Sequence, residues 1–355
     1  MSIRASVRAL ARYHFTPRTS SVKLDQNESP FDLPDAVKAA ALERLRSTAW
    51  QRYPELHPRS LEEALAARHD WDPDGVVVAN GSNVLLQALV IVAGIGQSVL
   101  TVKPTFQVYG LQARLLGAEL IEVPLGEGFT LPVQALAGTM PERRGVAFVA
   151  NPAAPTGNVH PREALQPLLD RAGTDWLVVL DEAYADFAGT DHLDLVARHP
   201  QALSVRTLSK AFGLAGARVG YGLMRPELAA EVRKGLLPFS LSSLQASVAL
   251  AALEHPQYVE ERVALAIRER DRLFQGLAAL PGVEPFPSHT NFVLFRVHDA
   301  ERVHQGLLER DVAVRRQDHL PGLEGCLRVT AGAPDENDAF LVAMRQLTAT
   351  EAVGG

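Results

Sequence analysis

Lys210 is the side chain in this sequence with the clearest capacity for covalent chemistry. It lies at the end of an apolar run, with Thr207 and Ser209 just before it and Arg218 eight residues after it. A lysine amine can form a Schiff base with the aldehyde of a cofactor, and hydroxyl and guanidinium groups can hold a phosphate on that cofactor. We therefore interpret Lys210 as a catalytic lysine and its polar neighbours as phosphate ligands. Taken alone, the same residue also fits a solvent-exposed lysine at a strand end.

A carboxylate follows an earlier apolar run. Asp181 comes directly after Trp176-Leu177-Val178-Val179-Leu180, a run typical of a buried parallel strand. Open α/β sheets bind ligands at the carboxyl ends of such strands. Pyridoxal phosphate needs a buried carboxylate there, because its ring accepts electrons only while the pyridine nitrogen keeps its proton. Tyr184 could hydrogen-bond the phenolic oxygen of that ring, and the alternative role for Asp181 is a helix N-cap.

Composition limits the classes of protein to which the chain can belong. Its 355 residues, of which 47% are hydrophobic, are enough for two domains or for one large domain with an appendage. The formal net charge of −6 argues against a nucleic-acid partner, which would require a basic surface. The longest apolar stretch, residues 84–100, is broken by glutamine and glycine, so we expect no membrane span. Cys326 is the only cysteine, which excludes an intrachain disulfide and suits a cytoplasmic location.

Short apolar runs alternate with amphipathic ones from Val76 onward. This alternation is typical of a largely parallel sheet with helices on both faces, so we expect an α/β fold. The expected strands are residues 76–79, 99–102, 120–124, 145–150, 177–180, 203–206 and 219–223. Helices are expected between most of them, for example at residues 84–92 and 161–172.

The pattern changes after Ser240. Residues 244–280 are expected to form a long helix with one interruption at Pro256. A strand at 291–297, a helix at 300–310, two short strands near 312–314 and 327–329, and a last helix from Asp335 should follow. These elements predict a second, smaller α/β unit.

Taken together, Asp181-Glu182-Ala183-Tyr184, the Ser209-Lys210 pair and Arg218 resemble the fold-type-I pyridoxal-phosphate aminotransferases, and more narrowly their histidinol-phosphate branch. Four further segments resemble that branch: residues 23–30 (Lys-Leu-Asp-Gln-Asn-Glu-Ser-Pro), 52–54 (Arg-Tyr-Pro), 104–106 (Pro-Thr-Phe) and 326–332 (Cys-Leu-Arg-Val-Thr-Ala-Gly). The resemblance covers nearly the whole chain. It implies a large domain of residues 28–245 with a mostly parallel sheet flanked by helices, a discontinuous small α/β domain of residues 1–27 and 246–355, and an active site between them.

The resemblance also implies which residues bind the cofactor. The helix start after Asn80-Gly81 would hold the phosphate through its N–H groups, and Phe106 would stack on the ring. Ordinary roles also stay open, namely an N-cap for Ser82 and a core position for Phe106. The expected ligands are Ser82, Asn83, Phe106, Asp181, Tyr184, Thr207, Ser209, Lys210 and Arg218, with Tyr53 supplied by a neighbouring subunit.

Arg328 and Arg315 are the expected ligands for the substrate anion, because a planar guanidinium suits carboxylate and phosphate. In the family the arginine matching Arg328 holds the α-carboxylate. Histidinol phosphate has no carboxylate, so its phosphate would take that place, with a second arginine at position 315. Side chains alternate along a strand, so either Arg315 or its neighbour Arg316 should face the cleft. Asn27 and Tyr13 are further substrate candidates, although Tyr13 also fits a loosely packed N-terminal aromatic.

The sequence departs from the family pattern in two places. The family has asparagine immediately before Pro-Thr-Gly, where its amide donates to the phenolic oxygen of the cofactor, and this chain has Ala154 there. Asn151, three residues earlier, is expected to lie too far away to replace it. Asn83 and Val84 stand where the family usually has an acidic pair. These departures affect the tuning of the cofactor and leave the fold prediction intact.

The resemblance implies an aminotransferase that moves an amino group between L-histidinol phosphate and 2-oxoglutarate or glutamate, as a homodimer with shared active sites. Lys210 would hold the cofactor and move the α-proton of the substrate. Three alternatives stay open: an aromatic or broad-specificity aminotransferase, a related phospho-amino-acid decarboxylase, and a catalytically impaired homologue that only binds ligand. We expect neither a metal site nor a nucleic-acid or membrane partner.

Overall fold

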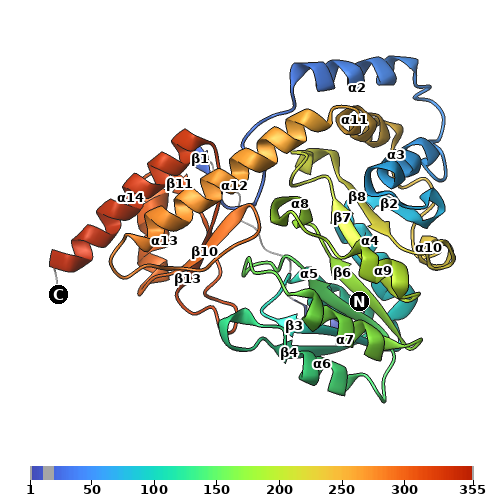
Figure 1. Cartoon of the computed structure of the whole chain (residues 1–355), viewed down its shortest axis with the longest axis horizontal. Coiled ribbons are helices and arrows are strands. Elements are labelled where there is room, and N and C mark those ends of the chain that lie inside the picture. Colours follow the sequence, from blue (N-terminus) through green and yellow to red (C-terminus); the bar gives the residue numbers. More distant parts are fainter. Residues whose placement is uncertain (1, 11–19, 354–355) are drawn as a thin grey trace.

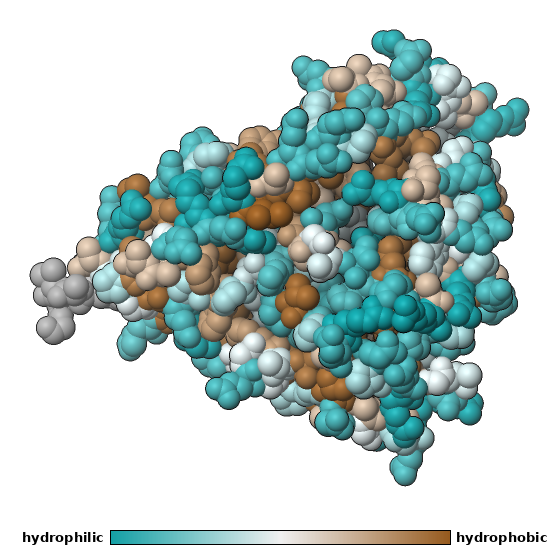
Figure 2. Space-filling model, viewed as in Figure 1, coloured by the Kyte–Doolittle hydropathy of each residue, from teal (hydrophilic) through white to brown (hydrophobic). Residues whose placement is uncertain are grey.

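The computed structural model describes residues 2–10 and 20–353 of the chain (Figure 1). It contains a seven-stranded, a four-stranded and a two-stranded sheet. No helix in this part of the chain is both long and apolar enough to cross a membrane. On the face seen in Figure 2, hydrophilic side chains cover most of the surface and hydrophobic ones appear in patches between them.

The seven-stranded sheet consists of the strands predicted from the sequence. They are β2 (Val76–Asn80), β3 (Ser98–Lys103), β4 (Glu119–Pro124), β5 (Gly145–Ala150), β6 (Trp176–Asp181), β7 (Ala202–Thr207) and β8 (Val219–Leu223), and each begins and ends within one residue of its prediction. Their order is β2-β8-β7-β6-β5-β3-β4. β8 is antiparallel to both neighbours and the other pairs are parallel. Every strand except β8 therefore ends at the same edge of the sheet.

Alternating residues of the central strands face two separate cores. On β5, Val146 and Phe148 pack into one cluster, while Ala147 and Val149 pack into the other. Strands buried on both faces are nearly continuous apolar runs, which is why these strands could be recognised in the sequence. The first core contains side chains from α4 (Ser82–Ala93), α5 (Val108–Leu116) and α10 (Pro226–Arg233), and the second from α6 (Val133–Thr139), α7 (Arg162–Ala172) and α9 (Leu193–Arg198).

The four-stranded antiparallel sheet forms a second unit, beside the large sheet in Figure 1. Its strands are β9 (Glu284–Pro285), β10 (Phe292–Arg296), β12 (Arg315–Arg316) and β13 (Cys326–Thr330), and α12 (Pro256–Ala278), α13 (Ala300–Glu309) and α14 (Pro334–Val353) belong to the same unit. β1 (Val22–Lys23) pairs in parallel with β11 (Val312–Ala313). Leu24, which follows β1, packs into the core of this unit, so the N-terminal segment is tied to the C-terminal part of the chain.

The helical region predicted over residues 244–280 consists of two helices, α11 (Ser243–Leu253) and α12. Pro256 lies at the start of α12, where proline is favoured because its missing N–H has no intrahelical partner to lose. α11 packs against α2 (Asp35–Ser47) and α3 (Arg59–His69), whereas α12 packs against α14, β9 and β10 and also against α8 (Ala185–Ala188) of the large unit. The predicted boundary between residues 245 and 246 thus falls inside α11. The domain boundaries stay a prediction, and this packing favours placing that one between α11 and α12.

The remaining elements are short. They are the helices α1 (Ala5–Arg8) and α8 (Ala185–Ala188) and the 3-10 turns η1 (Pro73–Gly75), η2 (Glu127–Phe129) and η3 (Ala215–Ala217). The strand predicted near residues 312–314 is divided into β11 and β12, which pair with different partners.

Gly220 on β8 lies against the start of α4, and a Cβ there would overlap the backbone of Gly81 and Ser82. We expect Gly220→Ala to destabilise the protein by roughly 1–3 kcal/mol, because backbone atoms cannot move aside as a flexible side chain can. Thermal unfolding measures the effect. Gly216→Ala is the matched control, since a Cβ at Gly216 meets no heavy atom of the described chain within 4 Å. Equal melting temperatures for the two variants would contradict the close approach.

Candidate active site

A cavity of about 270 Å³ lies at the carboxyl edge of the large sheet. It is lined by residues that follow β2, β3, β5, β6 and β7, because parallel strands end at one edge. Nine of the ten predicted cofactor ligands line it: Ser82, Asn83, Phe106, Asp181, Tyr184, Thr207, Ser209, Lys210 and Arg218. The structure therefore gathers in one place side chains that are spread over more than a third of the sequence.

Lys210 projects into this cavity, and its amine donates a hydrogen bond to the Gln26 carbonyl at 3.2 Å. Burial, together with the positive charges of Arg328 and Arg218, lowers the pKa of the Lys210 amine to about 8. A desolvated lysine of this kind carries a substantial neutral fraction near physiological pH. The neutral amine is the form that can attack an aldehyde or accept a proton.

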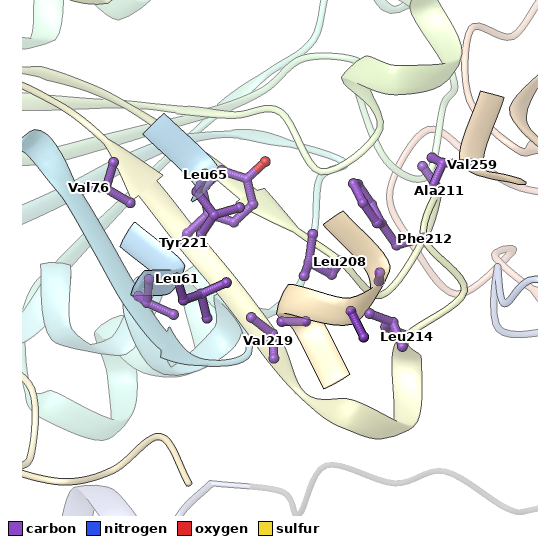
Figure 3. Close-up of a cluster of buried hydrophobic side chains, with 14 of the residues drawn as sticks. Leu61, Leu65, Val76, Leu208, Ala211, Phe212, Leu214, Val219, Tyr221 and Val259 are labelled. Atoms are coloured by element: carbon purple, nitrogen blue, oxygen red, sulfur yellow. The ribbon is translucent and has the colours of Figure 1, made fainter. Parts of the chain in front are cut away.

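A hydrophobic cluster anchors the loop that carries Lys210. Leu208, Ala211, Phe212 and Leu214 are all buried in it, on both sides of the lysine in sequence (Figure 3). The Phe212 carbonyl also accepts a hydrogen bond from the Tyr258 hydroxyl at 3.1 Å. The backbone around the lysine is therefore held by packing, while the amine remains free to enter the cavity.

One end of the cavity is suited to a phosphate. The Arg218 guanidinium donates to the Ser209 hydroxyl at 3.3 Å, which in turn lies 2.9 Å from the Thr207 hydroxyl. Gly81, not Ser82, is the N-cap of α4, so Ser82 does not have the alternative role of an ordinary N-cap. A Cβ at Gly81 would overlap Arg218. Backbone N–H groups at the helix start, two hydroxyls and a guanidinium thus converge where an anion would be stabilised.

A buried carboxylate also lines the cavity. Asp181 is 6% exposed, and it accepts hydrogen bonds from the Tyr109 hydroxyl at 2.6 Å and from the Ala183 N–H at 3.2 Å. Burial raises the pKa of Asp181 to about 6, against the opposing effect of the two hydrogen bonds. A cationic group placed beside this carboxylate would restore its ionised form.

Tyr109 is a site residue that the sequence interpretation missed. Its ring stacks on Phe148, with centroids 4.8 Å apart, and meets the edge of Phe106 at 5.7 Å. The available signal was its position three residues after Phe106, since this spacing places side chains on the same side of a helical turn. Tyr109 therefore links the predicted stacking residue to Asp181.

The neighbouring carboxylate, Glu182, behaves differently. It too is buried, but the Arg206 guanidinium lies 2.8 Å away and the His192 N–H donates to it. Burial opposes ionisation of Glu182, and these partners outweigh it and lower its pKa. Glu182 is thus a charged anchor for the turn after β6, whereas Asp181 is the carboxylate that faces the cavity.

Tyr184 and Ala154 also line the cavity. The Tyr184 hydroxyl accepts a hydrogen bond from the Asn27 amide at 2.8 Å. Ala154 has no polar side-chain atom. Asn151 does not compensate, because its amide bonds the His160 backbone with both ends, at 3.1 and 2.8 Å.

A second cavity of about 310 Å³ adjoins the first and shares Lys210 and Tyr184 with it. Arg315, Arg328 and Asn27 line it, as expected of substrate ligands. The Arg328 guanidinium donates to the Asp25 carbonyl at 3.0 Å and lies 5.2 Å from the centroid of the Phe292 ring.

The structure distinguishes the two adjacent arginines. Arg316 is turned away from the cavity and bonds Glu301 and Asp318, the latter at 2.6 Å. Arg315 alone of the pair lines the second cavity. This is the outcome expected for neighbouring residues on a strand, whose side chains point to opposite faces.

One predicted ligand is not brought to the cavities, and another cannot be placed. Tyr53 is 83% exposed and its ring stacks on Phe239, with centroids 5.1 Å apart. Its predicted role requires a second subunit, so a single chain cannot display it. Tyr13 lies outside the described residues.

The donor set fits pyridoxal phosphate. An anion cradle, an amine able to become neutral, a tyrosine hydroxyl and a buried carboxylate surround one cavity, with Phe106 beside it. These groups match the phosphate, aldehyde, phenolic oxygen and ring nitrogen of that cofactor. Within residues 2–10 and 20–353, no group of three or more potential metal-ligating side chains is gathered.

Asp181→Asn should stabilise the ligand-free protein at neutral pH. A carboxyl whose pKa is raised on folding contributes stability below its unfolded pKa and loses it as the pH rises through the folded value. Here the folded value is about 6 and the ordinary value 3.8. Wild type should therefore lose stability relative to the variant as the pH rises through about 6, by up to roughly 3 kcal/mol. Denaturant unfolding at several pH values measures this, and a difference independent of pH would contradict it.

Comparisons with known proteins agree with this geometry. The chain matches the family model for aminotransferase class I and II over residues 19–344. It is 47% identical to the histidinol-phosphate aminotransferase of Deinococcus radiodurans over 352 residues, which cover 97% of this chain and 96% of that one, and 38% identical to the one from Thermococcus gammatolerans over 98% of each chain. The fold is similar to the crystal structure of histidinol-phosphate aminotransferase from Sinorhizobium meliloti in complex with pyridoxal-5'-phosphate, with a TM-score of 0.89 and 23% identity over 99% of this chain and 98% of that one. The chain belongs to the class I and II aminotransferases.

Proposed function

We propose that this chain is a pyridoxal-phosphate-dependent aminotransferase that moves an amino group between L-histidinol phosphate and 2-oxoglutarate or glutamate. The observation that carries the proposal is the pair of adjoining cavities. The first holds Lys210, Asp181 and the anion cradle, and the second holds Arg315 and Arg328. The names of the two relatives with 47% and 38% identity support the choice of substrate.

The chain's own residues have distinct tasks in this proposal. When bound, the cofactor supplies an aldehyde that bonds amines and a ring that accepts the electrons released when a proton leaves the substrate α-carbon. Asp181 keeps the ring nitrogen protonated, because a buried carboxylate is stabilised by the positive charge next to it. Lys210 lies where the two cavities meet, and its Nζ takes the α-proton and returns it as general base and acid.

Arg315 and Arg328 account for the choice of a phosphorylated substrate. Each guanidinium can make two parallel hydrogen bonds to an anion, which is stronger and more directional than a lysine contact. Two arginines at one cavity suit a dianionic phosphate better than a single carboxylate. Arg328 is also held by the Asp25 carbonyl, which limits the positions that its guanidinium can adopt.

A donor panel of histidinol phosphate, phenylalanine, tyrosine and threonine phosphate tests the substrate. We expect histidinol phosphate to bleach the visible band of the bound cofactor most efficiently, and 2-oxoglutarate to restore it. Preference for phenylalanine or tyrosine would favour an aromatic aminotransferase, and loss of carbon dioxide from threonine phosphate would favour a decarboxylase. A band that no amino donor changes would favour a catalytically impaired homologue. That alternative is suggested by Ala154, which lacks a side-chain hydrogen-bond donor. Lys210→Ala, which lacks the amine, is the negative control.

Arg315→Gln should raise the KM for histidinol phosphate roughly 10- to 150-fold, the range expected for a lost hydrogen bond to a charged group. Steady-state kinetics with phosphorylated and unphosphorylated donors measures the effect, which should be smaller for phenylalanine. Arg316→Gln is the matched control, because its guanidinium bonds Glu301 and Asp318 away from the cavity. Equal effects at the two positions would remove Arg315 from the substrate site.

We also propose that the working unit is a homodimer with shared active sites, in the cytoplasm. The Tyr53 ring stacks on Phe239, and large hydrophobic side chains close to these two in sequence are exposed in the single chain, including Trp50 at 71% and Leu237 at 79%. Apolar groups exposed together are typical of a surface that a partner covers. Tyr53 would then reach the cofactor phosphate bound by the neighbouring subunit. The only cysteine, Cys326, is buried as a free thiol, which suits a reducing compartment.

Mixing two inactive variants tests the shared site. Lys210→Ala lacks the amine and Tyr53→Ala lacks the residue proposed to cross the interface. After subunit exchange, about a quarter of wild-type activity should return, because half of the randomly formed dimers would be heterodimers with one complete site. Light scattering gives the oligomeric state in the same samples. A stable and active monomer, or a mixture without recovery, would overturn the dimer proposal.

A further inference from the structure

Three side chains from distant parts of the sequence meet beside the cavity. Asn27 precedes α2, Tyr184 follows β6 and Thr330 ends β13. The Asn27 amide nitrogen lies 2.8 Å from the Tyr184 hydroxyl, and its oxygen lies 3.2 Å from the Thr330 hydroxyl. All three residues are buried, Asn27 and Thr330 to within 2% of full burial. A chain of hydrogen bonds therefore leads from the small sheet to the cavity wall.

The backbone of Asn27 is held as firmly as its side chain. Its φ of 54° is left-handed, a conformation that asparagine tolerates better than most residues. Its N–H donates to the Thr330 hydroxyl at 3.0 Å, and its carbonyl accepts from the Asn291 amide at 3.2 Å. Asn27 thus has fixed partners on its backbone N–H, on its carbonyl and on both ends of its side chain.

The Thr330 hydroxyl determines which end of the Asn27 amide faces Tyr184. That hydroxyl accepts the Asn27 N–H, so its own proton needs an acceptor, and buried polar groups are rarely left without one. The Asn27 side-chain oxygen is that acceptor. The NH₂ end of the amide must then point to Tyr184 and donate to its hydroxyl oxygen.

The consequence concerns the proton of Tyr184. Within the described residues, the Tyr184 hydroxyl makes one hydrogen bond, in which the Asn27 amide is the donor. The tyrosine proton is therefore left to point elsewhere, and the residue lines both cavities. Burial raises the pKa of Tyr184, against the lowering effect of Arg328 and Asn27, so the hydroxyl keeps its proton near neutrality.

We propose that Asn27 and Thr330 are positioning residues, which orient the Tyr184 hydroxyl so that it donates a hydrogen bond to the phenolic oxygen of the bound cofactor. The inference rests on the proposed function, because it requires pyridoxal phosphate in the first cavity. Ala154, which lines the same cavity, has no side-chain donor. Orientation of Tyr184 then carries the whole side-chain contribution at that oxygen. Asn27 thus acts on the cofactor through Tyr184.

The visible spectrum of the loaded protein provides a readout besides activity. A hydrogen bond donated to the phenolic oxygen withdraws negative charge from it. The visible spectrum changes when the nitrogen that joins Lys210 to the cofactor loses its proton. The donated hydrogen bond weakens the hold of the phenolic oxygen on that proton and therefore lowers the pH midpoint of the change. Loss of the donated bond should raise that midpoint by up to about one pH unit.

Thr330→Val and Thr330→Ser form the matched pair. The valine removes the hydroxyl while keeping the shape, so the Asn27 amide can turn and accept the tyrosine proton, and the midpoint should rise. The serine keeps the hydroxyl, and the midpoint should stay at the wild-type value. If the valine variant does not fold or load, Asn27→Asp takes its place, because a carboxylate accepts the tyrosine proton and should raise the midpoint in the same way.

Tyr184→Phe separates orientation from general damage to the site. In that background, Thr330→Val should add no further rise, because the proton that it redirects is gone. Ala154→Asn, which adds a donor without altering the three side chains, should lower the midpoint of wild type and of Thr330→Val. An unchanged midpoint in Thr330→Val, or a shift that persists without the tyrosine hydroxyl, would overturn the inference. A protein that shows no visible band with pyridoxal phosphate would instead overturn the proposed function.

Discussion

The site depends on one edge of the seven-stranded sheet, at which six of the seven strands end. Parallel strands buried on both faces carry apolar residues along their length, so polar side chains are confined to the turns that follow them. Asp181 and Ser209-Lys210 occupy such turns after β6 and β7, and α4 begins after β2 with its N–H groups directed to the same place. The sheet thus concentrates charge where the surrounding core leaves little water, and this desolvation shifts the pKa values of the reactive groups.

Desolvation acts in opposite directions on the two groups that face the cavity. It lowers the pKa of the Lys210 amine to about 8 and raises that of the Asp181 carboxyl to about 6. Both shifts favour the neutral form of the group. A protonated ring nitrogen beside Asp181 would favour its ionised form again. Glu182, next to Asp181 in sequence, escapes this because Arg206 pairs with it. Adjacent carboxylates therefore differ in chemistry because their partners differ, not because their burial does.

The second unit contributes side chains that the large sheet cannot supply. β1 pairs with β11, and the segment after β1 passes between the two units with Gln26 and Asn27 in contact with Lys210 and Tyr184. Arg315 and Arg328 approach from the small sheet, so the second cavity is closed by residues from both units. Cofactor chemistry is thus assigned mainly to the large sheet, and recognition of the substrate to the small one.

Sequence alone was sufficient for the local features. The seven strands, Lys210 and Asp181 follow from apolar runs and from the residues that end them, because the pattern of a buried strand is set by near neighbours. Comparison with a known family then added the roles of Arg315, Arg328 and the neighbouring residues of the cavity. These predictions concern groups that are close in sequence or carried by a recognisable segment.

Only the tertiary structure decided which distant groups meet. The choice between Arg315 and Arg316 depends on the face that β12 presents, and the bond from Tyr109 to Asp181 joins residues 72 positions apart. The Asn27–Thr330 pair spans 303 positions, and α11 belongs with α2 and α3 although it continues the pattern of α12. Contacts of this kind depend on how whole helices and strands pack against one another. That packing produces no periodic pattern in the sequence of either contacting segment. The sequence therefore determined the elements and the reactive side chains, while the fold determined their partners, orientation and protonation.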